Sequence, residues 1–231
     1  MDIQQNGRMA DAVRNNAEWC AALCRAHGIT GEWGPRAWTS PRRTPLYYPD
    51  AVTLAPGARA GDIVPLIDAA PGASVKDSFA TLDLTADGFG VLFDARWIHR
   101  PAPGPGTGGW EPVRTAEELA AWELAWSDGE GGGLFPPALL EEDAHTFLAA
   151  RDADGRTVAG AVASTSGPVV GVSNLFAADG GLDAAWAGCL DALARHRPGL
   201  DVVGYESGDD LDAAVRAGFA PVGELRIWLL R

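Results

Sequence analysis

The stretch Val169–Arg195 constrains the fold more than any other part of the chain. Its first segment, Val169–Phe176, has the apolar, β-branched composition typical of a strand, and an Ala-Asp-Gly-Gly turn follows it. Apolar residues then recur at the i, i+3, i+4, i+7 spacing of a helix with one buried face: Leu182, Ala185, Trp186, Cys189, Leu190 and Leu193. The sequence therefore predicts a strand, a glycine turn and an amphipathic helix, whose first N–H groups form a potential anion site.

Charge and composition narrow the class of protein. The formal net charge of −13 disfavours a nucleic-acid partner, because phosphate binding needs a concentrated basic surface. No apolar run approaches the roughly 20 residues of a membrane helix, and the first residues lack the pattern of a secretory signal. With only three cysteines, the chain suits a reducing compartment. We therefore expect a cytoplasmic protein without a membrane partner, and the sequence leaves open whether it forms a homo-oligomer.

Cys20, Cys24 and His27 share one face of a predicted helix over Met9–His27. That geometry could hold a metal ion. However, the two cysteines continue an apolar stripe with Val13, and a buried free cysteine behaves as a small hydrophobic residue. We therefore expect core packing and no metal.

The segment Gly31–Pro49 is rich in aromatic residues and arginine, and its four prolines predict an irregular loop. Trp33 and Trp38 on this loop could anchor it or line a substrate pocket. A short helix is expected over Asp62–Ala69, with Pro65 in its first turn.

Two strand-like runs, Ser74–Leu84 and Phe89–His99, flank an Asp-Gly turn and predict a β-hairpin. Asp77 and Asp94 on these strands are candidate substrate-binding residues. His99 lies next to a Pro-Gly segment and is expected at the surface.

Arg100–Gly109 is the clearest linker, because it contains mainly proline and glycine. It predicts an N-terminal half-domain over residues 1–105 and a second domain over 106–231. In the second domain the pattern predicts a brief strand, a helix over Thr115–Trp126 with a Thr115/Glu118 capping box, a short helix and three meander strands. The helix of Val169–Arg195, a strand at Asp201–Glu206, a short helix and a closing strand complete a mixed α+β structure.

This order of elements resembles the GCN5-related N-acetyltransferase (GNAT) superfamily over about Gly109–Arg231. The closing AAVRAGFAPVG followed by LRIWLL is similar to the short helix, Gly-Phe and final strand with which that family ends. The first half is similar, more loosely, to an extra half-domain of some bacterial members. The resemblance implies an α+β fold in which helices flank a mixed central sheet, with a smaller N-terminal α/β half-domain. It also implies transfer of an acyl group, for which acetyl is the first expectation, from acyl-CoA to a small amine.

The resemblance also implies where the co-substrate acetyl-CoA, or another acyl-CoA, would bind. The backbone of the strand end would hold the pantetheine arm and the turn would hold the pyrophosphate. The implied cofactor-binding residues are Asn174, Leu175, Phe176, Ala177, Gly180, Gly181 and Leu182.

Two features depart from the family pattern. The Arg or Gln that usually leads the phosphate turn is missing, and Asp179 and Asp183 flank the helix start instead. A positive partner for the phosphates would then come from elsewhere, and we considered Arg36, Arg42 and Arg43. The second departure is Ala214, which stands where many members have a tyrosine that protonates the departing thiolate. These departures leave an alternative, a catalytically inactive GNAT-fold protein that binds a ligand or a partner.

Glu206 is the candidate general base, because a carboxylate at this strand end would lie beside the crevice. Alternatively, its carboxylate caps the following Gly-Asp-Asp turn. Tyr205, its neighbour, is the second candidate catalytic residue.

Overall fold

The computed structural model describes residues 3–106, 108–178 and 181–231. The chain forms two compact units, the first made of Met1–Trp97 with Val222–Arg231 and the second of Ile98–Pro221. Two strands, β5 (Phe89–Arg100) and β11 (Ala220–Leu230), pass from one unit into the other. The linker Arg100–Gly109 lies inside the second unit.

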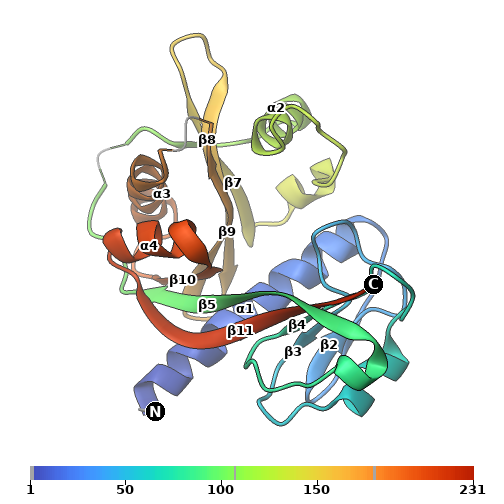
Figure 1. Cartoon of the computed structure of the whole chain (residues 1–231). Helices are drawn as coiled ribbons and strands as arrows, with labels where there is room; N and C mark the ends of the chain where they lie inside the picture. Colours follow the sequence, from blue (N-terminus) through green and yellow to red (C-terminus); the bar gives the residue numbers. More distant parts are fainter. Residues whose placement is uncertain (1–2, 107, 179–180) are drawn as a thin grey trace. The chain divides into compact units, whose positions relative to one another are not determined.

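The first unit consists of a long helix, α1 (Ile3–Ala26), and a mixed sheet (Figure 1). Within this unit the strand order is β1-β2-β3-β4-β11-β5. The strands not yet named are β1 (Glu32–Trp33), β2 (Ala37–Thr39), β3 (Ala51–Thr53) and β4 (Ser74–Asp77). Short 3-10 turns at Ala60–Asp62, Val64–Leu66 and Thr85–Asp87 complete the unit. One core of this unit gathers Ile63, Val75, Leu84, Phe89 and Trp228.

Several sequence predictions for the first unit are wrong. The runs before and after Gly88 do not form a hairpin, because β11 lies between β4 and β5. β11 pairs antiparallel with β4, with Arg226 opposite Asp77. The proline-rich segment contains β1 and β2, since its prolines all fall outside these short strands. The helix expected over residues 62–69 is replaced by two 3-10 turns, and α1 begins at Ile3 rather than Met9.

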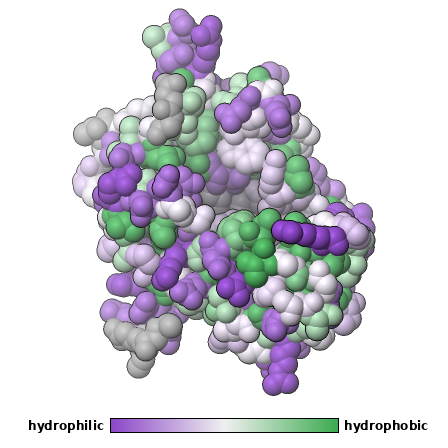
Figure 2. Space-filling model, in the orientation of Figure 1, coloured by the Kyte–Doolittle hydropathy of each residue, from purple (hydrophilic) through white to green (hydrophobic). Residues whose placement is uncertain are grey.

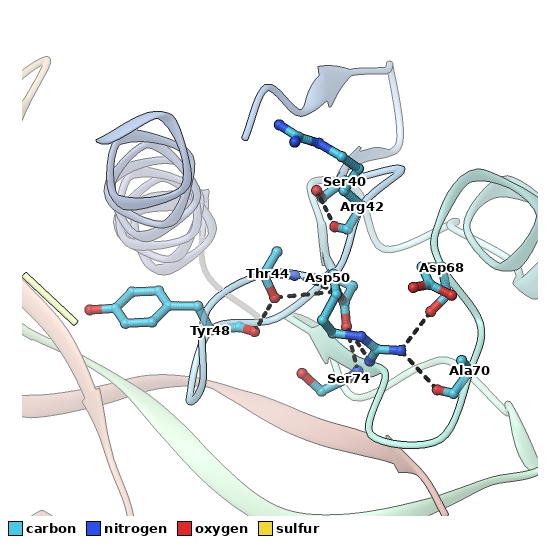
Figure 3. Close-up of polar contacts among 9 residues, drawn as sticks. Ser40, Arg42, Thr44, Tyr48, Asp50, Asp68, Ala70 and Ser74 are labelled. Carbon is cyan, nitrogen blue, oxygen red and sulfur yellow. Dashed lines mark hydrogen bonds and ion pairs between the residues drawn. The ribbon is translucent and has the colours of Figure 1, made fainter. Parts of the chain in front are cut away.

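Asp50 organises the loop that precedes β3 (Figure 3). Its side chain is 1% exposed, and its Oδ1 accepts hydrogen bonds from the backbone N–H and the hydroxyl of Thr44, at 3.0 and 3.2 Å. The Oδ2 atom accepts from the backbone N–H of Ser74 at 2.9 Å and forms an ion pair with Arg43 at 3.2 Å. Arg43 also donates to the carbonyl oxygens of Asp68 and Ala70. One carboxylate thus ties the loop, β4 and the segment before β4 together.

The second unit is a sheet with helices on both faces (Figure 1). From β10 (Asp201–Glu206) the strand order runs through β9 (Val169–Ala177), β8 (Thr157–Ser166) and β7 (His145–Arg151) to β6 (Glu111–Pro112). The helices are α2 (Ala116–Trp126), α3 (Leu182–His196) and α4 (Gly208–Arg216), with a 3-10 helix at Pro137–Glu141. β9 and β10 are parallel, and α3 connects them as the sequence predicted.

Each face of this sheet has its own core. Trp122 of α2 donates its indole N–H to the carbonyl of Leu148 at 2.9 Å, and it packs edge-on against Phe135, Phe147 and Phe176. On the other face, α3 and α4 bury Leu148, Ala161, Val170, Val202, Trp186, Leu193 and Phe219 together. Phe147 and Leu148 lie on opposite faces because side chains alternate along a strand.

The local signals in the second half are confirmed. Thr115 caps α2, its hydroxyl accepting from the N–H of Glu118 while the Glu118 carboxylate accepts from the N–H of Thr115. The hairpin β7–β8 forms around Gly155, whose φ of 80° suits glycine. Its tip, at residues 152–156, presents a hydrophilic surface (Figure 2). Among the described residues, no helix has the length and apolar character to cross a membrane.

Candidate active site

The two parallel strands of the second unit separate partway along their length. Within the described part of the chain, β9 and β10 pair only at Val169, Val170 and Gly171, opposite Asp201–Val203. Beyond these pairs, residues 172–177 of β9 and 204–206 of β10 continue as strands without pairing to each other. Beyond Gly171 the edge of β9 that faces β10 therefore forms no ladder with it.

A β-bulge lies in β9 beside this split. Val162 of β8 pairs with Ser173 and Gly160 pairs with Phe176, so that Ala161 alone faces the two residues Asn174 and Leu175. Asn174 adopts a left-handed conformation with φ of 54°, which asparagine tolerates better than most residues. A bulge bends its strand and increases the local twist, and this accounts for the separation of β9 from β10.

Gly204 keeps the start of the split clear of side chains. A Cβ atom at this position would lie 3.0 Å from the carbonyl oxygen of Val172, in a contact tighter than ordinary van der Waals distance. Any other residue at position 204 would place side-chain atoms against the β9 backbone. Glycine at position 204 therefore lets the two strands approach closely at the point where their pairing ends.

The helix α3 begins after the described end of β9, and among the described residues no side-chain hydrogen bond caps its start. Its N-cap is Gly181, and the first turn contains Leu182 and Asp183. The Asp183 carboxylate accepts hydrogen bonds from Arg216 of α4 at 2.9 Å. The acidic residue that we expected to repel a phosphate is therefore paired with a cation. Gly180 and Asp179, which the sequence analysis also assigned to this turn, lie outside the described residues.

Glu206 ends β10, next to the split. Its side chain is half-buried, and burial together with the nearby carboxylate of Asp210 raises the pKa of Glu206 to about 8. A carboxyl group with this pKa exchanges a proton near neutral pH, which is the property of an effective general base. Tyr205 precedes it and is half-buried, whereas Ala214, on α4, is completely buried in the core.

The candidate substrate residues all belong to the first unit. Trp38 is fully buried, whereas Trp33 is exposed. The guanidinium carbon of Arg14 lies 4.8 Å from the centre of the Trp33 ring. Asp77 is buried, and its carboxylate accepts from the backbone N–H of Leu82 at 2.8 Å; burial raises the pKa of Asp77. These contacts orient the loop after β4.

Asp94 is exposed and bonded to Arg226 at 2.7 Å, and this hydrogen bond lowers the pKa of Asp94. The arginines considered as phosphate partners are also bonded within the first unit. Arg36 donates to the carbonyl of Gly57 and Arg42 to that of Gly28, while Arg43 belongs to the Asp50 network.

Three other residues singled out in the sequence are buried. Cys20 and Cys24 lie in the α1 core, where burial raises the pKa of both thiols, that of Cys24 to about 12. Both thiols therefore stay protonated and pack as small side chains. His99 is 2% exposed, with its Nε2 2.9 Å from Asp201 Oδ2, so the expected surface position is wrong.

Sequence reasoning missed two parts of this site. The Asn174 bulge has one local signal, an asparagine within an apolar strand, which is a residue that adopts positive φ more readily than others. Arg216 lies 33 positions from Asp183 along the chain, and only the packing of α4 beside α3 brings the two together.

The fold is that of the GNAT superfamily. A GCN5-related N-acetyltransferase from Kribbella flavida aligns with a TM-score of 0.60 at 16% identity, over 94% of this chain and 95% of that one. A putative acetyltransferase of the GNAT family from Novosphingobium aromaticivorans aligns with a TM-score of 0.58 at 15% identity, over 96% and 100%.

A more distant similarity is to Saccharomyces cerevisiae N-myristoyltransferase with bound myristoyl-CoA, with a TM-score of 0.50 at 10% identity over 69% of this chain and 51% of that one. No protein-family model and no curated protein sequence matches the chain. At these identities the similarities establish the fold, a mixed α+β architecture with helices flanking a large mixed sheet.

Proposed function

We propose that the protein is an acyl-CoA-dependent N-acyltransferase that transfers an acyl group, with acetyl as the first expectation, to a small amine. The observation that carries this proposal is the split between β9 and β10, opened by the Asn174 bulge and leading along the chain to the start of α3. The structural neighbours, among them a protein with bound myristoyl-CoA, support the same co-substrate class.

The residues of the split fit the chemistry of such a co-substrate. The backbone of residues 172–177, along the edge of β9 that forms no ladder with β10, can bond to the amides of a pantetheine arm, as an added strand would. The first N–H groups of α3 suit a pyrophosphate, and Arg216 supplies positive charge beside them. Acyl-CoA, when bound, supplies an acyl group activated as a thioester.

Glu206 and Tyr205 are the residues that we assign to proton movement. The Glu206 carboxylate accepts a proton from the amine, which frees the nitrogen lone pair to attack the thioester carbonyl. A C–N bond then forms and the C–S bond breaks, with the electron pair leaving on sulfur, and the nitrogen gives up its second proton to water. The Tyr205 hydroxyl donates a proton to that sulfur and regains one from water. The buried Ala214 cannot take this role.

Ala214 also favours the alternative, a GNAT-fold protein that binds a ligand or partner without transfer. The two functions differ in one measurement. An enzyme releases free CoA thiol from acetyl-CoA in the presence of an accepted amine, whereas a binding protein does not. A panel of small primary amines, including diamines, tests this, with Glu206→Gln protein as the background control.

Acetyl-CoA is expected to raise the melting temperature by about 5–10 °C at a concentration of about 100 Kd. The physical reason is that the split and the α3 start exist only in the folded chain, so that the ligand stabilises that state. Differential scanning fluorimetry measures the shift, and ATP at the same concentration serves as the control for nonspecific anion binding. An unchanged melting temperature at millimolar acetyl-CoA contradicts both the enzyme and the acyl-CoA site.

The substitution Arg216→Gln is expected to weaken CoA binding about tenfold, because one charge-assisted contact to a phosphate is lost. The ion pair with Asp183 is exposed, with side chains 58% and 66% accessible, so its removal leaves the fold intact. Isothermal titration calorimetry gives the affinity. Arg156→Gln, at the exposed β7–β8 tip, removes the same charge elsewhere in the unit and should bind CoA as the wild type does. Equal affinities for all three proteins would exclude Arg216 from the site.

A further inference from the structure

A cavity lies in the second unit, at the other end of α3 from the proposed acyl-CoA site. Its volume is about 410 Å³, and it is bordered by the C-terminal end of α3, the start of β7, the 3-10 helix before β7 and the segment after β6. α3 has 15 residues and is therefore about 22 Å long, so this cavity is remote from the helix start. The charged residues lining it include Arg114, His196 and Arg197.

Arg197 is held rigidly at the wall of this cavity by neutral acceptors. Its guanidinium donates to the hydroxyls of Thr165 and Thr146, both at 2.9 Å, and to the carbonyl of Asp143 at 2.8 Å. A further bond reaches the carbonyl of His196 at 3.1 Å. Over residues 3–106, 108–178 and 181–231, no carboxylate forms an ion pair with Arg197. A half-buried, preorganised guanidinium without a counter-ion is electrostatically incomplete.

One further cation, Arg114, and one neutral imidazole, that of His196, line the same cavity. Arg114 is exposed, and within the described residues its guanidinium has no hydrogen-bond or ion-pair partner, so it is free to close over a ligand. His196 lies in the last turn of α3, and burial with the nearby charges of Arg195, Arg114 and Arg197 lowers the pKa of its imidazole.

Two acidic residues, Glu142 and Asp143, also line the cavity. Glu142 is paired with His145, at 3.3 Å between Oε2 and Nε2, and Asp143 is exposed to solvent, which screens its carboxylate. Glu111 is paired with Arg195 at 3.2 Å. Among the described residues, neither carboxylate of the lining forms an ion pair with Arg114 or Arg197.

We propose that this cavity binds a small oxyanion, a phosphate or carboxylate group of a small molecule, between Arg114, His196 and Arg197. The four bonds of Arg197 leave one N–H of its Nη1 for a ligand, and the exposed guanidinium of Arg114 adds its own donors, an arrangement suited to oxyanion recognition. A volume of about 410 Å³ accommodates a molecule larger than the anion alone. This site is independent of the proposed acyltransferase activity.

Calorimetric titration of the whole protein with inorganic phosphate and, separately, with citrate tests the proposal and tells the phosphate and carboxylate sources apart. Titrations run at constant ionic strength, with chloride as the reference anion. We expect saturable binding of at least one of the two, weakened about tenfold or more by Arg114→Gln. The Arg114→Gln substitution removes no contact on which the fold depends. The same holds for the two control substitutions, Arg216→Gln and Arg156→Gln.

The variants identify where the anion binds. Arg216→Gln, which alters the start of α3, and Arg156→Gln at the hairpin tip should each leave the affinity unchanged. If Arg216→Gln weakens binding and Arg114→Gln does not, the anion occupies the α3 start and the proposal is overturned. Absence of saturable heat with both anions, or equal loss in all three variants, also overturns it.

Discussion

Replacing Glu206 by glutamine is expected to lower kcat by about two to four orders of magnitude, because the amine then keeps its proton and cannot attack. Glutamine has nearly the same shape, so the fold should be retained. With wild-type protein, kcat/KM should rise as pH increases and level off above about 8, since the base is active only when deprotonated and burial raises its pKa to about 8. Release of free CoA thiol, measured against pH, checks both expectations.

Asp210→Asn provides a matched test of the same assignment. The Asp210 carboxylate helps to raise the pKa of Glu206, so that its neutralisation should shift the pH profile to lower pH while leaving the maximal rate near that of the wild type. Wild-type turnover in Glu206→Gln protein would remove Glu206 from the mechanism. If the pH profiles of Asp210→Asn and wild-type protein are the same, a group other than Glu206 titrates.

The raised pKa of Glu206 also predicts a pH dependence of stability. Its pKa is higher in the folded chain than the 4.5 of an unfolded chain. Folding therefore favours the protonated carboxyl, and this contribution to stability is present below pH 4.5 and is lost as pH rises towards 8. Glu206→Gln should thus melt at a higher temperature than the wild type at pH 9.

Asp50→Asn is expected to reduce the free energy of unfolding by about 3–5 kcal/mol. The substitution leaves the Arg43 guanidinium without its counter-ion and turns one acceptor into a donor that faces the N–H of Ser74 or Thr44. Urea denaturation followed by tryptophan fluorescence measures the change.

Asp68→Asn is the control for this prediction, because Asp68 is exposed and contributes to the network only through its backbone carbonyl. It removes the same charge and should change stability by less than about 0.5 kcal/mol. If both variants unfold at the same urea concentration, the Asp50 network does not hold the first unit together.

Local sequence signals predicted the elements of the second half of the chain more accurately than those of the first half. The Thr115/Glu118 pair, the turn before Arg156 and the apolar stripe of α3 each act within a few residues, and the structure forms them where the sequence predicted. The wrong hairpin has a different origin. A turn at Gly88 is compatible with direct pairing of its flanks, and only the long-range insertion of β11 excludes it.

The candidate site shows the same limit. Position 206 could be proposed from the sequence because a strand end is visible as the end of an apolar run. The raised pKa of Glu206, by contrast, depends on burial and on Asp210, which lies on the next helix. The counter-charge from Arg216 and the exposed Arg114 beside Arg197 arise from tertiary packing, and no spacing in the sequence encodes them.

The position of β11 in the first unit has a consequence for biogenesis. Residues 222–230 form an inner strand there, between β4 and β5, although about 120 residues of the second unit are translated before them. During synthesis, the second unit can therefore fold while the sheet of the first unit still lacks the strand between β4 and β5. Chaperone dependence of the nascent chain should therefore be concentrated in its earliest part, and expression of residues 1–105 alone would yield a sheet without its inner strand.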